Sequence, residues 1–393
     1  MMKADNPREF DSADPAHLEP AEEPRAPVLI NPTESSSPGG QRCAGEADPA
    51  PALTVILPIR NEASHIGALL EELSEQSLPL GRFEVLVVDG MSTDGTRAIA
   101  SEALRRFPAG RLLDNPKGLA SAARNIGVAN ASTPYVLFID GHCTIPHRDM
   151  LKAALHAFQQ GERCLSRPQH LVGTTLFQKA VALARGAPLG HYSGSQIYEE
   201  DDRHCDPTSA GCGYSRDLYL DLGGVDESLD AAEDLEFNVR VHRSGIQALH
   251  SRRFGLAYHA RSRWSALFRQ MYRYGYGRAR LALKHPYAFS PLAAGASAVS
   301  IAAVVMPGIG MFWPPAWYLW LVGAISYGVI VATAAASVTR GGGVRLWLAT
   351  TACFPAIHFG SGLGYLAGLV GGPSFQHARD ATSAAKSAGA RVN

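Results

Sequence analysis

Short β-rich runs that alternate with helical segments constrain the fold of this chain more than any other feature. The runs have the length of strands, and they lie at 53–58, 83–88, 111–113 and 135–139. Strands and helices in alternation form βαβ units, in which neighbouring strands run parallel. A continuous apolar run such as 135–139 also indicates a strand that is buried on both faces. We therefore predict an α/β fold with a Rossmann-like, mixed but mainly parallel sheet that carries helices on both faces.

Polar side chains follow two of these runs at the point where each strand ends. Asp89 ends the second run, and Asp140-Gly141-His142 follows the run at 135–139. Because the carboxyl ends of parallel strands meet at one edge of a sheet, we expect these groups to share a crevice. In an extended segment Asp140 and His142 point to the same side, so the pair is able to hold one cation. A turn-capping Asp and an ordinary loop histidine explain this stretch alone equally well.

The expected crevice lacks the common nucleotide-binding motifs. No GxGxxG follows the first strand and no GxxxxGK[ST] occurs, so a nucleotide must be held by other groups. Asp89 is placed to accept hydrogen bonds from a ribose or a uracil, and its alternative role as a helix cap suits Asp94 better. Lys117 and Arg124 can face a diphosphate, because a guanidinium matches phosphate oxygens, or they are surface charges on a helix.

A second group of carboxylates begins a later helix. Glu233 and Asp234 fall in the first turn of a segment in which Leu235, Val239 and His242 recur at helical spacing. The helix dipole favours anions at this end, so an ordinary helix start looks the same. The residues alone leave a structural and a chemical role open.

The ordered series of motifs resembles a known enzyme family. The segments that carry the resemblance are Leu57–Glu62, Val88–Thr96, Lys117-Gly118, Ala123–Gly127 and Ile139–His142. In this order they are similar to the family 2 glycosyltransferases with the GT-A fold, and most similar to the membrane-anchored enzymes of succinoglycan-type exopolysaccharide assembly. The resemblance covers roughly residues 51–285. The family commonly has Asp-x-Asp where this chain has Asp140-Gly141-His142, so the second metal ligand departs from the family pattern.

The resemblance implies a role for each residue of a site. The nucleotide sugar would be bound by Pro58, Arg60, Glu62, Asp89, Lys117, Gly118, Arg124, Asp140 and Gly141; a divalent metal by Asp140, His142 and His259; and the acceptor by Gly211, Gly213, Gln270 and Arg273. Asp234 matches the general base, with Glu233 beside it. An imidazole suits Mn²⁺ better than Mg²⁺, and the choice between the two metals stays open. His259, a lone histidine in a basic region, can equally be structural.

The implied activity is the transfer of a sugar from a nucleoside-diphosphate sugar, expected to be a UDP-sugar, to a polyprenyl-linked glycan. A hydroxyl that attacks an anomeric carbon must lose its proton, and a cation must neutralise the departing diphosphate. One base opposite the leaving group needs no covalent intermediate, so we expect inversion. The alternatives are a processive polysaccharide synthase and a non-catalytic scaffold of a polysaccharide assembly complex. Tyr274 stands where the QxxRW motif of processive synthases has Trp, which weakens the first alternative.

Charge along the chain predicts membrane attachment. The formal net charge of zero argues against nucleic acid as a partner. Acidic residues stop at Glu236 and return at Asp380, whereas arginines continue through that interval. Arginines beside apolar segments are typical of the cytoplasmic flanks of spanning helices. An apolar stripe among arginines at 261–287 indicates a helix in the membrane interface, with a core-packing helix as the alternative.

The parts of the chain follow from these observations. We predict a disordered tail at 1–50, a GT-A catalytic domain at 51–260, the amphipathic helix at 261–287, about three transmembrane helices within 288–372 and a flexible tail at 373–393. Apolar segments near 291–312, 316–338 and 344–370 are long enough to span a bilayer. The tail at 1–50 has no apolar core of the kind that a signal peptide needs. We therefore expect a multi-pass protein of the plasma (inner) membrane with a cytoplasmic catalytic domain, unless the third segment is re-entrant.

Overall fold

The computed structural model describes residues 50–190, 196–229, 231–289 and 291–371. The tails predicted at 1–50 and 373–393 lie outside these residues, apart from Ala50. All the elements described below belong to one unit of the chain, Ala47–Asn393.

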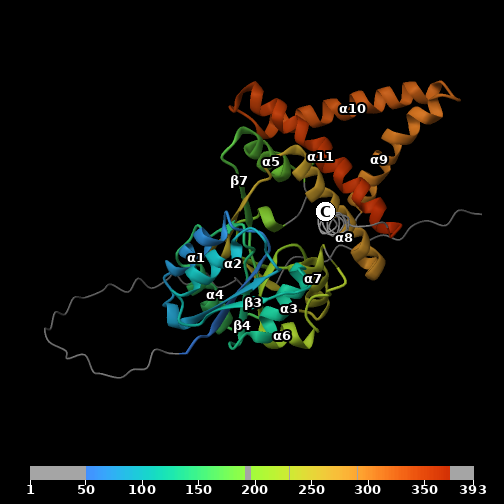
Figure 1. The fold of residues 1–393 in the computed structure, drawn as a ribbon. Helices are drawn as coiled ribbons and strands as arrows, with labels where there is room; N and C mark the ends of the chain where they lie inside the picture. The colour runs from blue at the N-terminus through green and yellow to red at the C-terminus, as the bar shows by residue number, and fades with distance from the viewer. Residues whose placement is uncertain (1–49, 191–195, 230, 290, 372–393) are drawn as a thin grey trace, which may run out of the picture. The chain divides into compact units, whose positions relative to one another are not determined.

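A large mixed sheet carries the α/β part of the chain (Figure 1). Its strands are β1 Leu53–Ile59, β2 Phe83–Asp89, β3 Gly110–Asp114, β4 Tyr135–Phe138, β6 Cys164–Ser166, β8 Arg203–Cys205, β9 Gly211–Ser215 and β10 Ala248–His250, in the order β3-β2-β1-β4-β9-β6-β10-β8. The neighbouring strands β3, β2, β1 and β4 run parallel, whereas β9 is antiparallel to both β4 and β6. The predicted mixed α/β sheet is confirmed.

Helices cover both faces of this sheet, and alternating side chains explain why. One face packs on α1 Ile66–Ser74, α2 Thr96–Leu104 and α4 Met150–Gln159, and the other on α3 Ala120–Asn130, α6 Arg216–Asp221 and α7 Glu233–Arg243. Val55 and Leu57 of β1 belong to the first core, whereas Ile56 between them belongs to the second. Both faces of the strand are buried, so its sequence is continuously apolar.

A small second sheet extends from the carboxyl edge of the large one. It consists of β5 Cys143–Thr144, β7 Gln169–Val172 and β11 Leu256–His259, with β11 in the middle. The antiparallel pairing of β11 with β5 places Tyr258 opposite Cys143. The end of the Asp140-Gly141-His142 segment therefore lies beside β11.

A long helix, α8 Trp264–Lys284, follows the second sheet and packs along α11 Gly343–Leu369. Leu267 and Met271 are buried in one cluster with Phe354 and Ile357 of α11. The core-packing alternative accounts for these two side chains of the predicted apolar stripe. A location of α8 in the membrane interface stays a prediction.

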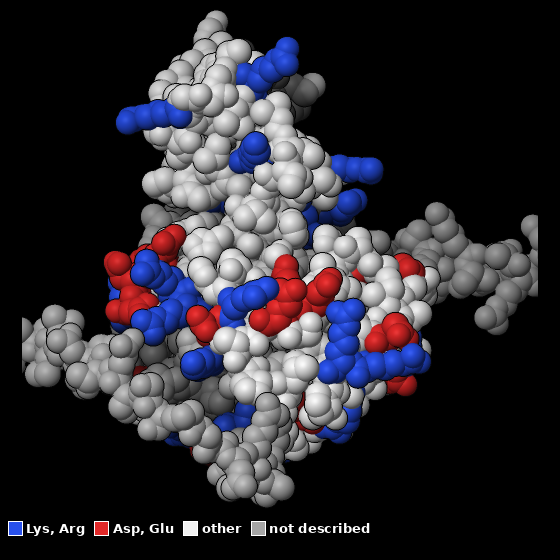
Figure 2. All heavy atoms as spheres, turned by 90° about the vertical axis from the view of Figure 1, so that its left-hand side faces the viewer, with Lys and Arg blue, Asp and Glu red and all other residues white. Residues whose placement is uncertain are grey.

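Three helices coincide with the three apolar segments predicted to span a membrane: α9 Pro291–Gly310, α10 Pro315–Val338 and α11. Among the residues that the structure describes, only α10 is both long and apolar enough to cross a bilayer. Its side chains are largely uncovered, as at Tyr318 and Val322. In the view of Figure 2 the upper part of the molecule is white and blue without red, as expected from the absence of acidic residues there. One candidate span is therefore found, and a multi-pass arrangement stays a prediction.

Candidate functional site

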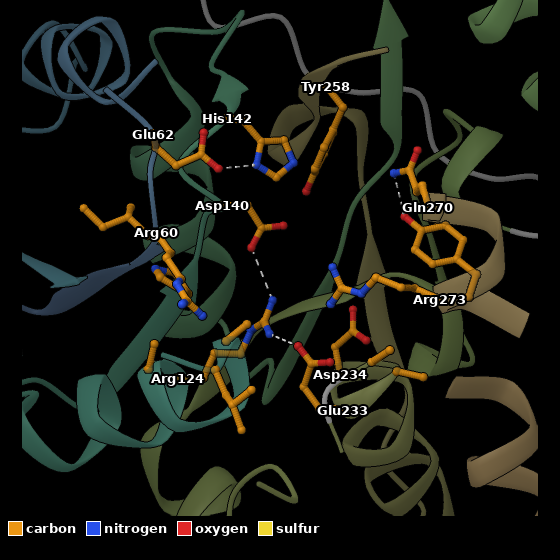
Figure 3. Close-up of a pocket in the computed structure, with 18 of the residues that line it drawn as sticks. Arg60, Glu62, Arg124, Asp140, His142, Glu233, Asp234, Tyr258, Gln270 and Arg273 are labelled. Carbon is orange, nitrogen blue, oxygen red and sulfur yellow. Dashed lines mark hydrogen bonds and ion pairs between the residues drawn. The ribbon is translucent and has the colours of Figure 1, made fainter. Parts of the chain in front are cut away.

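A cavity of about 930 Å³ lies at the carboxyl edge of the large sheet. The loops after β1 and β4 and the first turn of α7 line one side of it, through Glu62, Asp140 and Asp234. Arg269 and Arg273 of α8 line another side. Figure 3 shows Asp140, Asp234 and Arg273 extending from these separate elements into one space. Groups far apart in the sequence therefore share one crevice.

Most of the predicted site residues line this cavity. They are Pro58, Arg60, Glu62, Gly118, Arg124, Asp140, His142, Glu233, Asp234, His259, Gln270 and Arg273. The lining does not include Asp89, Lys117, Gly141, Gly211 or Gly213.

Arg124 links two of the acidic groups of the site. Its Nη2 atom lies 3.2 Å from Oδ1 of Asp140, and its Nη1 atom pairs with Oε1 of Glu233. The guanidinium is almost fully buried and lies over the Phe138 ring, 5.9 Å from its centroid. Arg124 was predicted to face a diphosphate. In the structure it connects the loop after β4 to the first residue of α7.

Glu233 and Asp234 are neighbours in the sequence but differ in their surroundings. Burial raises the pKa of the Glu233 carboxyl against the opposing charge of Arg124. Asp234 is exposed and lines the cavity, and its Oδ1 atom accepts a hydrogen bond from the Leu235 amide at 2.8 Å. The helix begins after Ala232, which has a φ of 62°, a left-handed conformation that is unusual for a residue with a Cβ. Of the two carboxylates, Asp234 is the more accessible to a substrate, and Glu233 is engaged by Arg124.

The segment from Asp140 to Cys143 forms a turn rather than the extended conformation that we expected. The Cys143 amide donates to the carbonyl of Asp140 at 3.1 Å, and this local bond ends the strand register at Phe138. Asp140 and His142 nevertheless both line the cavity. An added Cβ at Gly141 would lie 2.8 Å from Ile59 Cγ2, so the turn needs a glycine to pass this side chain.

His142 is held by a carboxylate on the opposite side of the turn. Its Nδ1 atom lies 3.3 Å from Oε1 of Glu62, as Figure 3 shows, and its ring meets Tyr258 edge to face. Burial opposes protonation of the imidazole, but the bond to Glu62 and the charge of Asp140 outweigh it, so the pKa of His142 is raised above its ordinary value.

The three predicted metal ligands are not assembled as a set. Within the described ranges, no group of three or more His, Cys, Asp or Glu side chains is arranged to hold a metal ion. His259 lies 3.2 Å from Thr144 Oγ1 and stacks on His65, because the register of β11 places Tyr258 beside the turn instead. Asp140 and His142 remain as an oxygen and a nitrogen donor, which fits a cation whose other ligands are phosphate oxygens and water.

The remaining predicted nucleotide-sugar residues have protein partners. Asp89 is fully buried, and its carboxylate accepts from Ser92 Oγ at 2.5 Å and from Arg97 at 3.0 Å. Lys117 Nζ pairs with Glu227 at 2.5 Å. The Gly118 carbonyl accepts from Arg60 at 3.3 Å. These contacts shape the loops after β1, β2 and β3.

Comparison with known proteins identifies the family. Residues 54–223 match the model of the glycosyl transferase family 2. The chain is also 33% identical to the succinoglycan biosynthesis protein ExoA of Rhizobium meliloti over 292 residues, which are 71% of this chain and 85% of that relative. The chain belongs to the family 2 glycosyltransferases.

Two further similarities agree with this assignment. The glycosyltransferase AglE of Haloferax volcanii is 38% identical over 104 residues, which cover 26% of this chain but only 34% of that relative. A solved mannosyltransferase of Pyrobaculum calidifontis, in complex with GDP-Man and Mn²⁺, matches with a TM-score of 0.51 and 19% identity over 81% of this chain and 87% of its own. At this identity the match shows the fold alone, and it confirms the predicted GT-A fold of this glycosyltransferase.

The residues predicted to bind the acceptor of the glycosyltransferase fall into two groups. Gln270 and Arg273 line the cavity, and Gln270 Nε2 lies 3.3 Å from the Tyr274 hydroxyl. Gly213 lies within the sheet, where an added Cβ would be 3.0 Å from Leu137 Cδ1. Gly211 packs against the Asn238 side chain. Both glycines therefore serve strand packing, and Gly211 also borders a small recess beside the cavity.

Several lining residues were not predicted. Arg269 and Arg278 share the cavity wall with Arg273, but a helical projection of 264–284 places only Arg269 near Arg273, so helical spacing would not have found Arg278. Asn61 and Met91 have φ values of 57° and 59° and also line the cavity. Such strained backbone clusters at functional sites, and no local sequence signal marks it here.

Proposed function

We propose that this family 2 glycosyltransferase moves a sugar from a nucleoside-diphosphate sugar, with UDP-sugars the first candidates, to a membrane-held glycan, with inversion at the anomeric carbon. The observation that carries the proposal is the placement of an accessible carboxylate, Asp234, and a second polar pair, Asp140 and His142, in one cavity at the strand ends. Direct transfer needs a base on one side of the sugar and charge neutralisation on the other.

Asp140 and His142 are the residues proposed to act on the donor side of the reaction. A divalent cation held between these residues and the diphosphate would stabilise the leaving group as the sugar–phosphate bond breaks. Mn²⁺ and Mg²⁺ both remain candidates, and the mannosyltransferase of the same fold contains Mn²⁺. Arg60 lines the cavity beside this pair and adds positive charge near the diphosphate.

The acceptor side falls to Asp234. Its carboxylate would accept the proton of the attacking hydroxyl, and its position in the first turn of α7 and its hydrogen bond from the Leu235 amide orient it. Glu233, buried against Arg124, positions this turn rather than meeting the substrate. One base opposite the leaving group needs no covalent intermediate, so this arrangement favours single displacement.

The acceptor is proposed to be a polyprenyl-linked glycan in exopolysaccharide or cell-surface polysaccharide synthesis. Arg269, Arg273 and Arg278 of α8 line the cavity, and their charges suit the phosphates of such a lipid. α10 is apolar, largely uncovered and long enough to span a bilayer, which would bring the site to the membrane surface. The relative ExoA is a succinoglycan biosynthesis protein, which supports the same pathway class. We place the catalytic domain on the cytoplasmic face of the plasma membrane, where a polysaccharide assembly complex would be its partner.

Donor turnover tests the proposal. Detergent-solubilised full-length protein would be incubated with UDP-, GDP- and dTDP-sugars and Mn²⁺ or Mg²⁺, and release of nucleoside diphosphate would be measured. We expect slow, metal-dependent hydrolysis of one donor class, lost in Asp234→Asn and retained in Asp221→Asn, whose carboxylate is exposed at the end of α6. Failure to bind or turn over any nucleotide sugar, with or without lipid acceptor, would refute the proposal in favour of a scaffold.

A further inference from the structure

A buried arginine outside the residues discussed so far has unused hydrogen-bond donors. Arg167 follows β6 and is 4% exposed. Its Nη2 atom donates to the Phe138 carbonyl at 2.6 Å. Its Nε and Nη1 atoms are buried and have no hydrogen-bond partner among the described residues. Most buried polar groups in folded proteins are hydrogen-bonded, so two such donors on one guanidinium call for an explanation, for which a water or a ligand group is a candidate.

The charge of Arg167 is equally uncompensated by a direct ion pair. Within the described part of the chain, no carboxylate lies within salt-bridge distance of its guanidinium. Burial disfavours the charged form, but Cys212, Tyr258, Cys143 and Asp140 keep the pKa of Arg167 above its ordinary value. A buried, unpaired cation is costly, so the arrangement is best explained by an anion that enters with a ligand.

Arg167 lines a recess of about 50 Å³ that adjoins the large cavity. The two spaces share the lining residues Arg124, Asp140, Gln169, Asp234 and Tyr258. The recess is too small for a sugar ring, because one water already takes about 30 Å³ of liquid volume. It has room for one small polar group of a ligand that lies in the cavity.

The position of the recess identifies which part of the substrate can reach it. Asp140 and Asp234, which border both spaces, are the donor-side and acceptor-side groups of the proposed reaction. The transferred sugar must lie between the departing diphosphate and the base. A substituent of that sugar is therefore the group that can enter the recess.

We propose that Arg167 binds a carboxylate on the transferred sugar, so that the donor is the nucleotide of a hexuronic acid. This inference rests on the proposed glycosyltransferase function. A carboxylate supplies both acceptor atoms and the missing negative charge, whereas the hydroxymethyl group of a neutral hexose supplies only an acceptor. Gln169, which lines both spaces, is placed to contact the same substituent. Arg167 is thereby a specificity-determining residue.

Donor pairs that differ only at C6 test this assignment. We would compare UDP-glucuronic acid with UDP-glucose, UDP-galacturonic acid with UDP-galactose and GDP-mannuronic acid with GDP-mannose, using detergent-solubilised full-length protein and measuring KM and kcat separately. Wild type should have a KM for the acid of the preferred pair about 10-fold or more below that for the neutral sugar, as a charge-assisted hydrogen bond predicts. Arg167→Gln should raise the KM for the acid about 10- to 100-fold and leave that for the neutral sugar nearly unchanged.

The wild-type preference alone can overturn the inference, even if Arg167→Gln does not fold. A wild-type enzyme that turns over the neutral member of each pair in preference refutes the uronic-acid assignment and leaves the glycosyltransferase function intact. An Arg167→Gln variant that loses both donors equally shows that Arg167 only balances the charge of Asp140. Arg167→Lys, which keeps the charge, should retain part of the preference for the acid. Turnover of no nucleotide sugar at all would instead refute the function on which the inference rests.

Discussion

Arg124 of α3 and Glu233 form a buried ion pair that joins α3 to the start of α7, a helix far along the chain. Glu233 directly precedes the exposed Asp234 in the sequence. The buried salt bridge therefore determines the position of the proposed base. It also reaches Asp140 through the second guanidinium nitrogen. One arginine thus fixes the spacing between the donor side and the acceptor side of the cavity.

Removal of Arg124 should be strongly destabilising. In Arg124→Met the Glu233 carboxyl keeps its buried position without a partner, and breaking such a pair costs about 3–5 kcal/mol. We expect a clear fall in Tm in detergent, partly reversed in the double variant Arg124→Met/Glu233→Leu, which removes both charges. Arg105→Met, which breaks an exposed pair with Glu102, is the control and should change Tm little. Equal Tm values for the two single variants would contradict this account.

Substitutions of Asp234 and of Glu233 should have different effects on kcat and on Tm. Asp234→Asn removes the proposed base and should lower kcat by about 10²- to 10⁴-fold with little change in the KM for the donor. Glu233→Gln removes the partner of Arg124 and should lower Tm in addition to activity. The measurement is steady-state transfer together with thermal unfolding for both variants. If Glu233→Gln lost all activity at an unchanged Tm while Asp234→Asn stayed active, Glu233 would be the base and Asp234 the positioning residue.

The identity of the second donor-side ligand should decide the metal preference. Asp140→Ala should abolish metal-dependent binding of UDP, measured by titration calorimetry, because it removes the only carboxylate of the pair. His142→Asp replaces the imidazole with a harder oxygen ligand and should shift the preference from Mn²⁺ towards Mg²⁺. If UDP binds wild type and Asp140→Ala equally, with and without metal, the assignment of this pair is wrong.

An ion pair between α8 and the loop before α7 should make stability depend on acid pH. Burial opposes ionisation of Asp226, but Lys284 and Ser228 outweigh it and lower the pKa of this carboxyl to about 2. A lowered pKa stabilises the folded state above the unfolded pKa of about 3.9, and the stabilisation is lost as the pH falls towards 2. The Tm difference between wild type and Asp226→Asn should thus be constant above pH ~5 and shrink below pH ~4. A difference that grows on acidification would have the wrong sign.

The fold was predictable because its signals are local. The apolar run at 135–138 belongs to two cores at once, and this double burial requires continuously apolar residues. The residue at which a helix begins was harder to predict from the sequence. α1 begins at Ile66 and not directly after β1, because the Asn61 amide donates to Ser92 and its side chain accepts from Thr93. These partners are thirty-one and thirty-two residues away in sequence, so no window around Asn61 reveals them.

The site was predictable only where the family pattern specifies residue types. Asp140, Asp234 and Arg273 line the cavity as the resemblance implied. Arg167 carries no motif, and its significance lies in burial without partners, which is a property of the tertiary structure. The position of His259 beside His65 is likewise a property of the tertiary structure, since strand register rather than composition determines it.

Because α8 forms part of the cavity wall, the catalytic unit of this enzyme extends beyond the α/β domain. Arg269, Gln270 and Arg273 lie beyond residue 260, where the α/β domain was expected to end, and α8 is packed along α11. A chain cut at that boundary would lose one side of its substrate site together with the helix that supports it. Exchange of acceptor specificity between relatives, in the laboratory or by recombination, would therefore have to carry α8 and its supporting helix along with the catalytic half.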